Sequence, residues 1–218
     1  MKGIFLIILS ILFGNYNCQA QSEKVEGFIP DGYVLFEKIS GDLNKDKQED
    51  CILIIKGTNK DKIVLNEYGE MVDRNRRGII ILFKNKNGYQ KATENINCFS
   101  SENEDGGIYF PPDLIIGVER GNLSIHYGHG RYGFWRYTFR YQQSDFKLIG
   151  YDERNGGAVI NSELSINFIT KKKLLKENIN ENAQSGEEVF KESWFKIEIN
   201  KLVSLSAIKD FDDVDMAY

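Results

Sequence analysis

The chain has 218 residues, with 28 Lys and Arg against 32 Asp and Glu and a formal net charge of −4. This length suits one domain, or two small ones packed together. The apolar residues, 41% of the chain, can build a core, which excludes a disordered or fibrous protein. The acidic balance and the lack of a long basic stretch argue against a protein that binds nucleic acid through its phosphates. Aromatic residues reach 12% and favour strands over helices.

A short apolar run from Ile4 to Phe13 follows the charged start of the chain. It is too short to cross a bilayer as a helix, which takes roughly 20 residues. A charged start, an apolar middle and a polar end with small residues are typical of a cleaved signal peptide, here residues 1–20 with cleavage after Ala20. We therefore expect an exported protein, periplasmic or secreted, with no transmembrane segment in the mature chain. Lipidation at Cys18 is the alternative.

Two cysteines, Cys51 and Cys98, remain in the mature chain. Export to an oxidising compartment permits one disulfide between them. The alternative is two buried, unpaired thiols, because each cysteine lies beside an apolar residue and free cysteine is often buried. The sequence leaves both arrangements open.

Apolar runs in the first half of the mature chain predict successive strands. The runs at 51–56 and 78–84 are dense in Ile and bounded by turn residues, as in strands covered on both faces. A further strand is predicted at 33–39. The Asn-Lys-Asn-Gly turn at 85–88 leads into another strand at 89–95, which completes a hairpin.

Alternating patterns in the second half predict an antiparallel meander. Strands at 114–119 and 123–127 flank the turn residues Arg120 and Gly121 and predict a hairpin. The strand 134–141 places aromatic side chains on one face and basic or polar ones on the other, because side chains alternate with period two. We expect the aromatic face in the core. The partner of this strand is predicted at 146–151.

The last part of the chain is more polar. Strands are predicted around 164–168 and 195–199, and the polar stretch 171–188 is predicted to be a long mobile hairpin tip. A short helical turn is expected within 204–211. The acidic residues that follow are predicted to form a solvated terminus, namely Asp212, Asp213 and Asp215.

These patterns predict one all-β domain over 21–218. The expected architecture is mainly antiparallel, a curved sheet, sandwich or partial-propeller arrangement with little helix. Two sub-halves, 31–97 and 108–203, are possible within it.

Oxygen-bearing side chains alternate in the loop between the first two strands. Asp42, Asn44 and Asp46 recur at every second residue, and Asp50 adds a carboxylate where the next strand begins. Hard cations take six to eight oxygen ligands, so these side chains with the carbonyl of Gln48 are a plausible set for Ca²⁺. The alternative is a polar turn whose Asp and Asn side chains bond their own backbone.

The loop resembles the calcium loop of FG-GAP/VCBS-type β-propeller repeats. The resemblance covers residues 41–55, Gly-Asp-Leu-Asn-x-Asp-x-x-x-Asp followed by an apolar strand, and the pattern occurs once. The family implies that the three carboxylates, the Asn side chain and the main chain at Gln48 hold Ca²⁺. The chain departs from the family at Lys47, where Gly usually takes a left-handed turn. The resemblance implies this type of loop and not a whole propeller, which needs several four-stranded blades.

The two histidines lie close together in a Gly- and Arg-rich segment. His126 and His129 could bind Zn²⁺ with further ligands, but no second ligand cluster is visible, and structural histidines are the favoured interpretation. Together with Arg131 they could line a recognition surface. Arg136 and Arg140, on the polar face of the aromatic strand, are the better recognition candidates.

Motifs of catalysis are absent from the sequence: there is no nucleophile elbow, P-loop, dinucleotide fingerprint or zinc-protease helix. We predict a non-catalytic binding module of the bacterial envelope with a Ca²⁺ loop, whose partner is a protein or another envelope ligand. An immunity-type partner of a toxin is one concrete form. The alternative is an envelope hydrolase with a site around His126, His129 and Arg131, which a pocket gathering His126, Arg131 and a carboxylate would favour.

Overall fold

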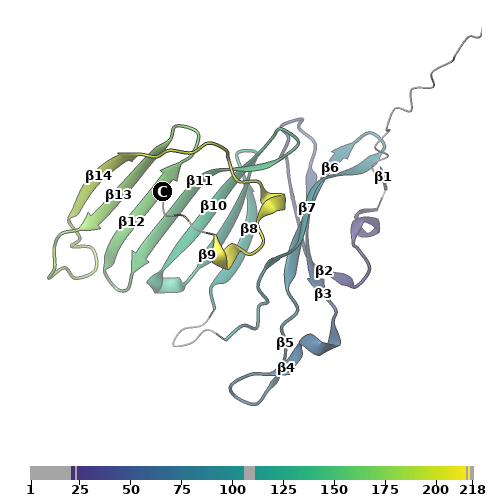
Figure 1. The fold of residues 1–218 in the computed structure, drawn as a ribbon, viewed down its shortest axis with the longest axis horizontal. Helices are drawn as coiled ribbons and strands as arrows, with labels where there is room; N and C mark the ends of the chain where they lie inside the picture. The colour runs from purple at the N-terminus through teal and green to yellow at the C-terminus, as the bar shows by residue number, and fades with distance from the viewer. Residues whose placement is uncertain (1–20, 23, 106–110, 215, 217–218) are drawn as a thin grey trace, which may run out of the picture.

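The computed structural model describes residues 21–22, 24–105, 111–214 and 216. The chain folds mainly into antiparallel β-sheets, and the helices among the described residues are short 3-10 turns (Figure 1). The predicted fold class is therefore confirmed. The predicted signal peptide, residues 1–20, lies outside the described residues, and so does Asp215. Within the described part of the chain, no helix has the length and apolar character needed to cross a membrane.

Five strands form the first sheet, in the order β1-β7-β6-β3-β2, and every neighbouring pair is antiparallel. A separate two-stranded ribbon, β4 with β5, extends from the connection between β3 and β6 (Figure 1). The bounds of these strands are Gln21–Ser22 (β1), Tyr33–Gly41 (β2), Asp50–Gly57 (β3), Ile63–Leu65 (β4), Met71–Asp73 (β5), Arg77–Asn85 (β6) and Gly88–Phe99 (β7).

The central strands β3 and β6 are buried on both faces, as their Ile-rich sequences predict. Ile52 and Ile54 belong to the main core, whereas Leu53 between them belongs to a second, smaller cluster on the opposite face. The N-terminal 3-10 helix η1 (Val25–Phe28) supplies apolar side chains to that smaller cluster. Burying a Leu or Ile side chain fully contributes roughly 1.5–3 kcal/mol, so these two strands anchor the first sheet.

Seven strands form the second sheet as a continuous meander, each paired with its neighbours along the chain. The predicted hairpin turn is confirmed, with φ of 52° at Arg120 and 74° at Gly121, as a two-residue hairpin turn requires. The bounds are Asp113–Glu119 (β8), Asn122–Gly128 (β9), Gly133–Gln142 (β10), Asp145–Gly156 (β11), Ile160–Asn167 (β12), Lys172–Asn178 (β13) and Phe190–Lys196 (β14).

The prediction of a long hairpin tip at 171–188 is wrong for its first part, which forms β13 and pairs with β12 and β14. The last strand also begins earlier than the predicted range 195–199. Both errors have one cause: this end of the sheet is open to solvent, so its strands need no apolar alternation. Long side chains still cover their neighbours there, as Lys173 does with its ammonium 5.6 Å from the ring centroid of Phe195.

The two sheets share one main hydrophobic core, to which both contribute buried side chains. The predicted aromatic face of β10 is confirmed as the core face: Tyr137 and Phe139 are buried, and Trp135 and Tyr141 pack against the cluster. Opposite them, in the first sheet, Phe99 belongs to the same cluster.

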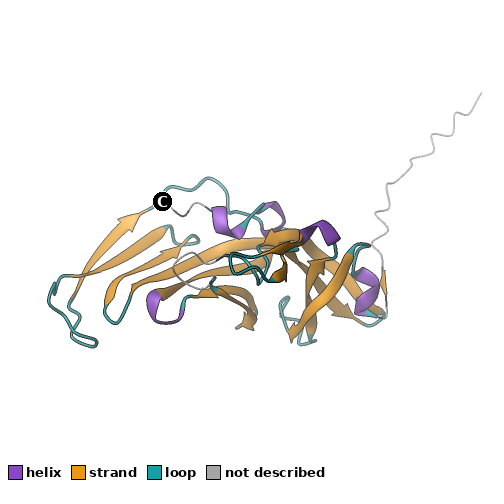
Figure 2. Cartoon of the chain, turned by 90° about the horizontal axis from the view of Figure 1, so that it is seen from below, coloured by secondary structure: helices purple, strands orange, loops and turns teal. Residues whose placement is uncertain are grey.

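The C-terminal segment returns from β14 across one face of the second sheet to the junction of the two sheets (Figure 1, Figure 2). It contains two 3-10 turns, η4 (Leu205–Ala207) and η5 (Phe211–Asp213), close to where a helical turn was predicted. Asn95 of β7 donates hydrogen bonds of 2.8 and 2.6 Å to the carbonyls of Leu205 and Ile208. The segment thereby ties the second sheet to the first.

Both cysteines of the described chain are free and buried. Cys51 belongs to the smaller cluster and Cys98 to the main core, on opposite faces of the first sheet. The disulfide that the sequence left open is not formed, and the arrangement is that of two buried thiols. Burial raises the pKa of both thiols, most strongly that of Cys98, and keeps them protonated.

Candidate functional site

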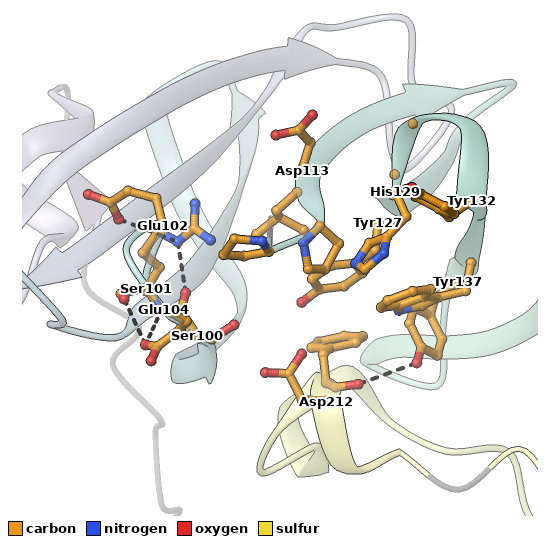
Figure 3. Close-up of a pocket in the computed structure, with 18 of the residues that line it drawn as sticks. Ser100, Ser101, Glu102, Glu104, Asp113, Tyr127, His129, Tyr132, Tyr137 and Asp212 are labelled. Atoms are coloured by element: carbon orange, nitrogen blue, oxygen red, sulfur yellow. Dashed lines mark hydrogen bonds and ion pairs between the residues drawn. The ribbon is translucent and has the colours of Figure 1, made fainter. Parts of the chain in front are cut away.

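A cleft of about 1310 Å³ lies at the seam between the two sheets (Figure 3). The first sheet contributes Arg77 of β6 and the loop 100–105 that follows β7. The second sheet contributes residues of β8 to β11, and the C-terminal segment contributes Phe211 and Asp212. Three parts of the chain that are distant in sequence therefore form one site.

The floor of the cleft is aromatic. The rings of Tyr127 and Trp135 lie nearly parallel, with centroids 5.5 Å apart and planes at 16°. Tyr137 packs edge-on against Phe211 at 5.1 Å, and its hydroxyl donates to the Phe211 carbonyl at 3.3 Å. Tyr151 completes the floor, 5.2 Å from Tyr137. Burial raises the pKa of all three tyrosines, so their hydroxyls stay protonated at neutral pH.

Two buried polar atoms of the lining have no hydrogen-bond partner among the described residues: the Tyr127 hydroxyl and Nε2 of His129. Tyr127 is only 2% exposed. An unsatisfied buried donor or acceptor costs about 1–3 kcal/mol, and such groups are rare in native proteins. Both atoms belong to one cleft, so a ligand in it can supply the missing partners.

A tight turn holds His129 in the lining. The 3-10 turn η3 (Gly130–Tyr132) follows His129. The backbone N–H of His129 donates to the carbonyl of Gly133 at 2.9 Å. Gly133 has φ of 118°, and a Cβ there would collide with the carbonyl oxygen of Arg154. Only glycine fits this position, so the sequence Gly-Arg-Tyr-Gly fixes where His129 lies.

The rim of the cleft carries both signs of charge. Its carboxylates come from the loop 100–105, from Asp113 at the start of β8 and from Asp212, which Figure 3 shows between the loop and the Tyr137 side. Partial desolvation raises the pKa of Asp212, against a hydrogen bond from Ser100. Arg77 is 8% exposed, and its Nε donates to the Ser100 carbonyl at 2.9 Å.

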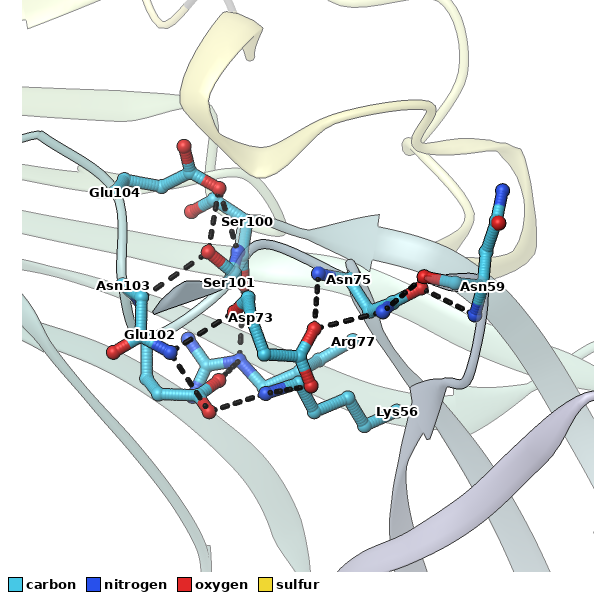
Figure 4. Close-up of polar contacts among 10 residues, drawn as sticks. All are labelled: Lys56, Asn59, Asp73, Asn75, Arg77, Ser100, Ser101, Glu102, Asn103 and Glu104. Carbon is cyan, nitrogen blue, oxygen red and sulfur yellow. Dashed lines mark hydrogen bonds and ion pairs between the residues drawn. The ribbon is translucent and has the colours of Figure 1, made fainter. Parts of the chain in front are cut away.

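A cluster of buried and partly exposed polar side chains holds the loop 100–105 in place (Figure 4). We call it the polar clamp; its members are Lys56, Asp73, Asn75, Arg77, Ser101 and Glu102. The side chain of Lys56 is 9% exposed, and its ammonium forms ion pairs with Glu102 and, at 3.0 Å, with Asp73. Asn75 donates to the Asp73 carboxylate at 2.7 Å. Because Glu102 belongs to both the clamp and the cleft, the clamp fixes one wall of the cleft.

We predict that Lys56→Met lowers the free energy of unfolding by about 1–2 kcal/mol at pH 7, because it leaves two carboxylates uncompensated. The partial exposure of these carboxylates to water keeps the loss below that of a fully buried ion pair. Burial by itself lowers the pKa of Lys56, but its hydrogen bonds to Glu102 and Asp73 outweigh this and raise it above 10.5. Burial raises the pKa of Asp73, but hydrogen bonds from Asn75 and Lys56 outweigh this and lower it below 3.8.

The directions of these two pKa shifts define the pH range in which the ion pairs of Lys56 stabilise the fold. The raised pKa of Lys56 means that its stabilisation is complete below 10.5 and is lost as pH rises through the folded-state pKa. The lowered pKa of Asp73 means that its stabilisation is present above 3.8 and is lost as pH falls through the folded-state pKa. In urea titrations the difference between Lys56→Met and wild type should therefore shrink from pH 7 to pH 2. Lys91→Met, whose exposed partner is Glu94, serves as control and should change stability by less than about 0.5 kcal/mol. An equally small change in Lys56→Met at pH 7 would contradict the prediction.

The histidines and arginines that lie close together in the sequence occupy two different places in the structure. His126 lies on the outer face of the second sheet, opposite Arg136 in register and stacked on Phe134 at 5.1 Å. Burial and the positive charge of Arg136 lower the pKa of His126. Arg136 forms an ion pair with Asp152 at 3.0 Å. Arg140 donates to the Asn122 side chain at 3.3 Å. His129 and Arg131 line the cleft instead.

In the predicted calcium loop, the Asp side chains accept hydrogen bonds from N–H groups of the same loop. Both oxygens of Asp42 accept N–H groups, from Lys45 and Asp46 on one side and from Lys47 on the other, at 2.6–3.2 Å. Asp46 accepts the N–H of Gln48 at 2.8 Å. Lys47 has φ of 70°, the left-handed turn for which the resembled family uses Gly. Among the described residues, no three His, Cys, Asp or Glu side chains are placed to hold a metal.

Asp50 differs from the other loop carboxylates because it is buried, at 1% exposed. It accepts N–H groups from Leu43 at 2.8 Å, from Asn44 at 3.3 Å and from Lys84 of β6 at 3.0 Å. Burial raises its pKa, while these three hydrogen bonds lower it, and burial is the larger effect. Asp50 therefore joins the loop to the first sheet.

Sequence reasoning missed most of the cleft. It placed the aromatic face of β10 in the core, and that face also forms the cleft floor. It treated Asp212 as part of a solvated terminus; Asp212 and Asp213 are exposed, but Asp212 lies at the cleft. Only the Gly-rich segment around His129 signalled the site.

The fold and the site define an all-β protein of two antiparallel sheets with an aromatic-floored cleft at their seam. Comparison of the chain with protein-family models, with curated proteins and with solved structures finds no match in any of the three.

Proposed function

We propose that the protein is an exported binding module of the bacterial envelope whose ligand occupies the cleft between the two sheets. The observation that carries this proposal is the pair of buried, unpartnered polar atoms, the Tyr127 hydroxyl and Nε2 of His129, in the lining of one large cleft. A cleft with an aromatic floor and a few polar groups is the usual form of a ligand site.

The surroundings of the two histidines favour a binding function over hydrolysis. A hydrolase of the nucleophile–base type needs a hydrogen bond between the two groups. Nε2 of His129 makes none with the described residues, and His126 lies on the opposite face of the sheet. The outer face with His126, Arg136 and Arg140 is available for a protein partner, such as a toxin in the immunity-type role.

We further propose that the loop 42–50 binds Ca²⁺ when the ion is present. The carboxylates of half-buried Asp42 and exposed Asp46 each have about four lone-pair sites, and backbone N–H groups use only some of them. Asn44 and the Gln48 carbonyl supply further oxygen of the kind that Ca²⁺ prefers. Asp50 is buried, and both of its oxygens accept backbone N–H groups, so it has the least capacity left.

The chain offers a matched experiment, because it has only two tryptophans: Trp135 in the cleft and Trp194, 63% exposed on β14. Trp194→Phe leaves a reporter in the cleft, and Trp135→Phe leaves one outside it. On titration with the low-molecular-weight fraction of a bacterial envelope extract, we expect a saturable change in emission from the first variant alone. An unchanged Trp135 emission at saturating extract, or a response confined to Trp194, would reject the cleft as the ligand site.

A further inference from the structure

We infer that the ligand of the cleft is an uncharged oligosaccharide. This inference rests on the proposed function and names the class of ligand. Size is the first argument: the cleft measures about 1310 Å³, whereas pockets for small molecules are usually about 300–1,000 Å³. A ligand of several linked units fills such a volume, and a single metabolite does not.

The lining carries charges of both signs, with more carboxylates than arginines, and this disfavours an anionic ligand most strongly. Arg77 and Arg131 line the cleft together with Asp113, Asp212 and the acidic loop 100–105. A cationic ligand meets the arginines and an anionic ligand meets the carboxylates, at a cost that grows where water is excluded. Hydroxyl groups both donate and accept hydrogen bonds, so an uncharged polyol can satisfy groups of either charge.

The floor matches the shape of a sugar ring. Trp135 stacks on the buried ring of Tyr127, with planes at 16° and centroids 5.5 Å apart, and this leaves the partly exposed Trp135 as the aromatic surface of the floor. Aromatic rings offer a broad apolar surface and, in Tyr and Trp, a polar tip. A pyranose has the complementary form, an apolar C–H face with hydroxyls around its edge.

The two unpartnered atoms fit the same ligand. The Tyr127 hydroxyl can both donate and accept, and Nε2 of His129 can do either, depending on its tautomer. Sugar hydroxyls complement both without needing a charge. The carboxylate of Asp212 lies close enough to Tyr127 to influence its pKa and adds an acceptor to the same part of the cleft.

An extended peptide is disfavoured by the strands of the floor. β6, β9, β10 and β11 are each paired on both sides, so they offer no free backbone to which a peptide strand could be added. β8 is the edge strand of the second sheet, but only its first two residues, Asp113 and Leu114, line the cleft, which is too short a stretch for strand addition. Peptides that bind β-proteins by strand addition need such an edge.

The test uses pure probes and the Trp194→Phe variant, with Trp135 as reporter. The uncharged trimers are triacetylchitotriose, cellotriose and maltotriose; the charged ones are the deacetylated glucosamine trimer and trigalacturonate, with trialanine as peptide. We expect saturable binding of at least one uncharged trimer, at least tenfold tighter than any charged trimer or trialanine. Adding Tyr127→Phe, which removes only the unpartnered hydroxyl, should weaken binding about tenfold without lowering the melting temperature. Tyr68→Phe, 79% exposed elsewhere, is the matched control and should have no effect.

The outcomes separate this inference from the proposed function. If Trp135 responds to envelope extract but to none of the uncharged trimers, or if a charged trimer or trialanine binds more tightly, the oligosaccharide assignment is overturned and the cleft remains a binding site. If Trp135 responds neither to extract nor to any trimer, both fail. Unchanged trimer affinity in Tyr127→Phe would also overturn the assignment, because the hydroxyl would then make no contact with the ligand.

Discussion

Replacing Phe211 by Ala is expected to lower the free energy of unfolding by about 3–5 kcal/mol, the usual cost of truncating a buried Phe. Phe211 is 1% exposed, stacks on Phe99 of the first sheet at 5.1 Å and meets Tyr137 and Phe139 of the second at 5.1 and 6.1 Å. One side chain from the C-terminal segment therefore completes a core that both sheets share. Its loss opens a cavity at the seam.

The same substitution should abolish ligand binding, because Phe211 is part of the cleft floor. Urea titration gives the stability, and Trp135 emission in the Trp194→Phe background gives the binding. Phe195→Ala, which removes an equally large ring that is 45% exposed on β14, should cost less than about 1 kcal/mol and leave binding intact. A loss below about 1 kcal/mol in Phe211→Ala would mean that the C-terminal segment is not part of the core.

Asp50→Ala should cost about 2–4 kcal/mol, with or without Ca²⁺. The substitution leaves three N–H groups without their acceptor, those of Leu43, Asn44 and Lys84, and each unsatisfied buried donor costs about 1–3 kcal/mol. The loss falls short of their sum because water reaches the partly buried donors. Melting curves in EDTA and in millimolar Ca²⁺ measure it.

Asp46→Ala is the matched control, since its side chain is exposed and hydrogen-bonded only within the loop. We expect it to change stability in EDTA by less than about 1 kcal/mol and to remove the rise in melting temperature that Ca²⁺ gives the wild type. A wild type that shows no such rise would refute the calcium proposal. Equal losses in EDTA for both variants would show that burial does not distinguish Asp50.

The strands of the first sheet could be predicted because the hydrophobic effect acts locally on them. Ile-rich runs such as 51–56 and 78–84 must be covered on both faces, and the structure covers them with the second sheet and with η1. Turn residues act locally too, and the positive φ of Arg120 and Gly121 confirms the hairpin between β8 and β9. Where solvent covers the sheet, in β13 and β14, the pattern was weak and the prediction failed.

The cleft could not be predicted, because its parts meet only when the two sheets pack. Arg77, Tyr127 and Asp212 lie far apart in the chain and have no spacing that links them. His126 and His129 show the reverse: three residues apart in the sequence, they end on opposite sides of the sheet. The two histidines separate because side chains alternate between the faces of β9 and because the chain turns between His129 and Gly133.

The order of apolar, polar and turn residues by itself determined an all-β fold, because strand formation depends on local alternation. The composition excluded a disordered chain and a phosphate-contacting nucleic-acid binder, because burial and charge depend on residue content. The tertiary structure alone decided that Cys51 and Cys98 lie on opposite faces of a sheet and that Phe211 closes the core. It also decided that the Tyr127 hydroxyl is buried without a partner. These features are contacts between segments distant in sequence, and only packing can bring such segments together.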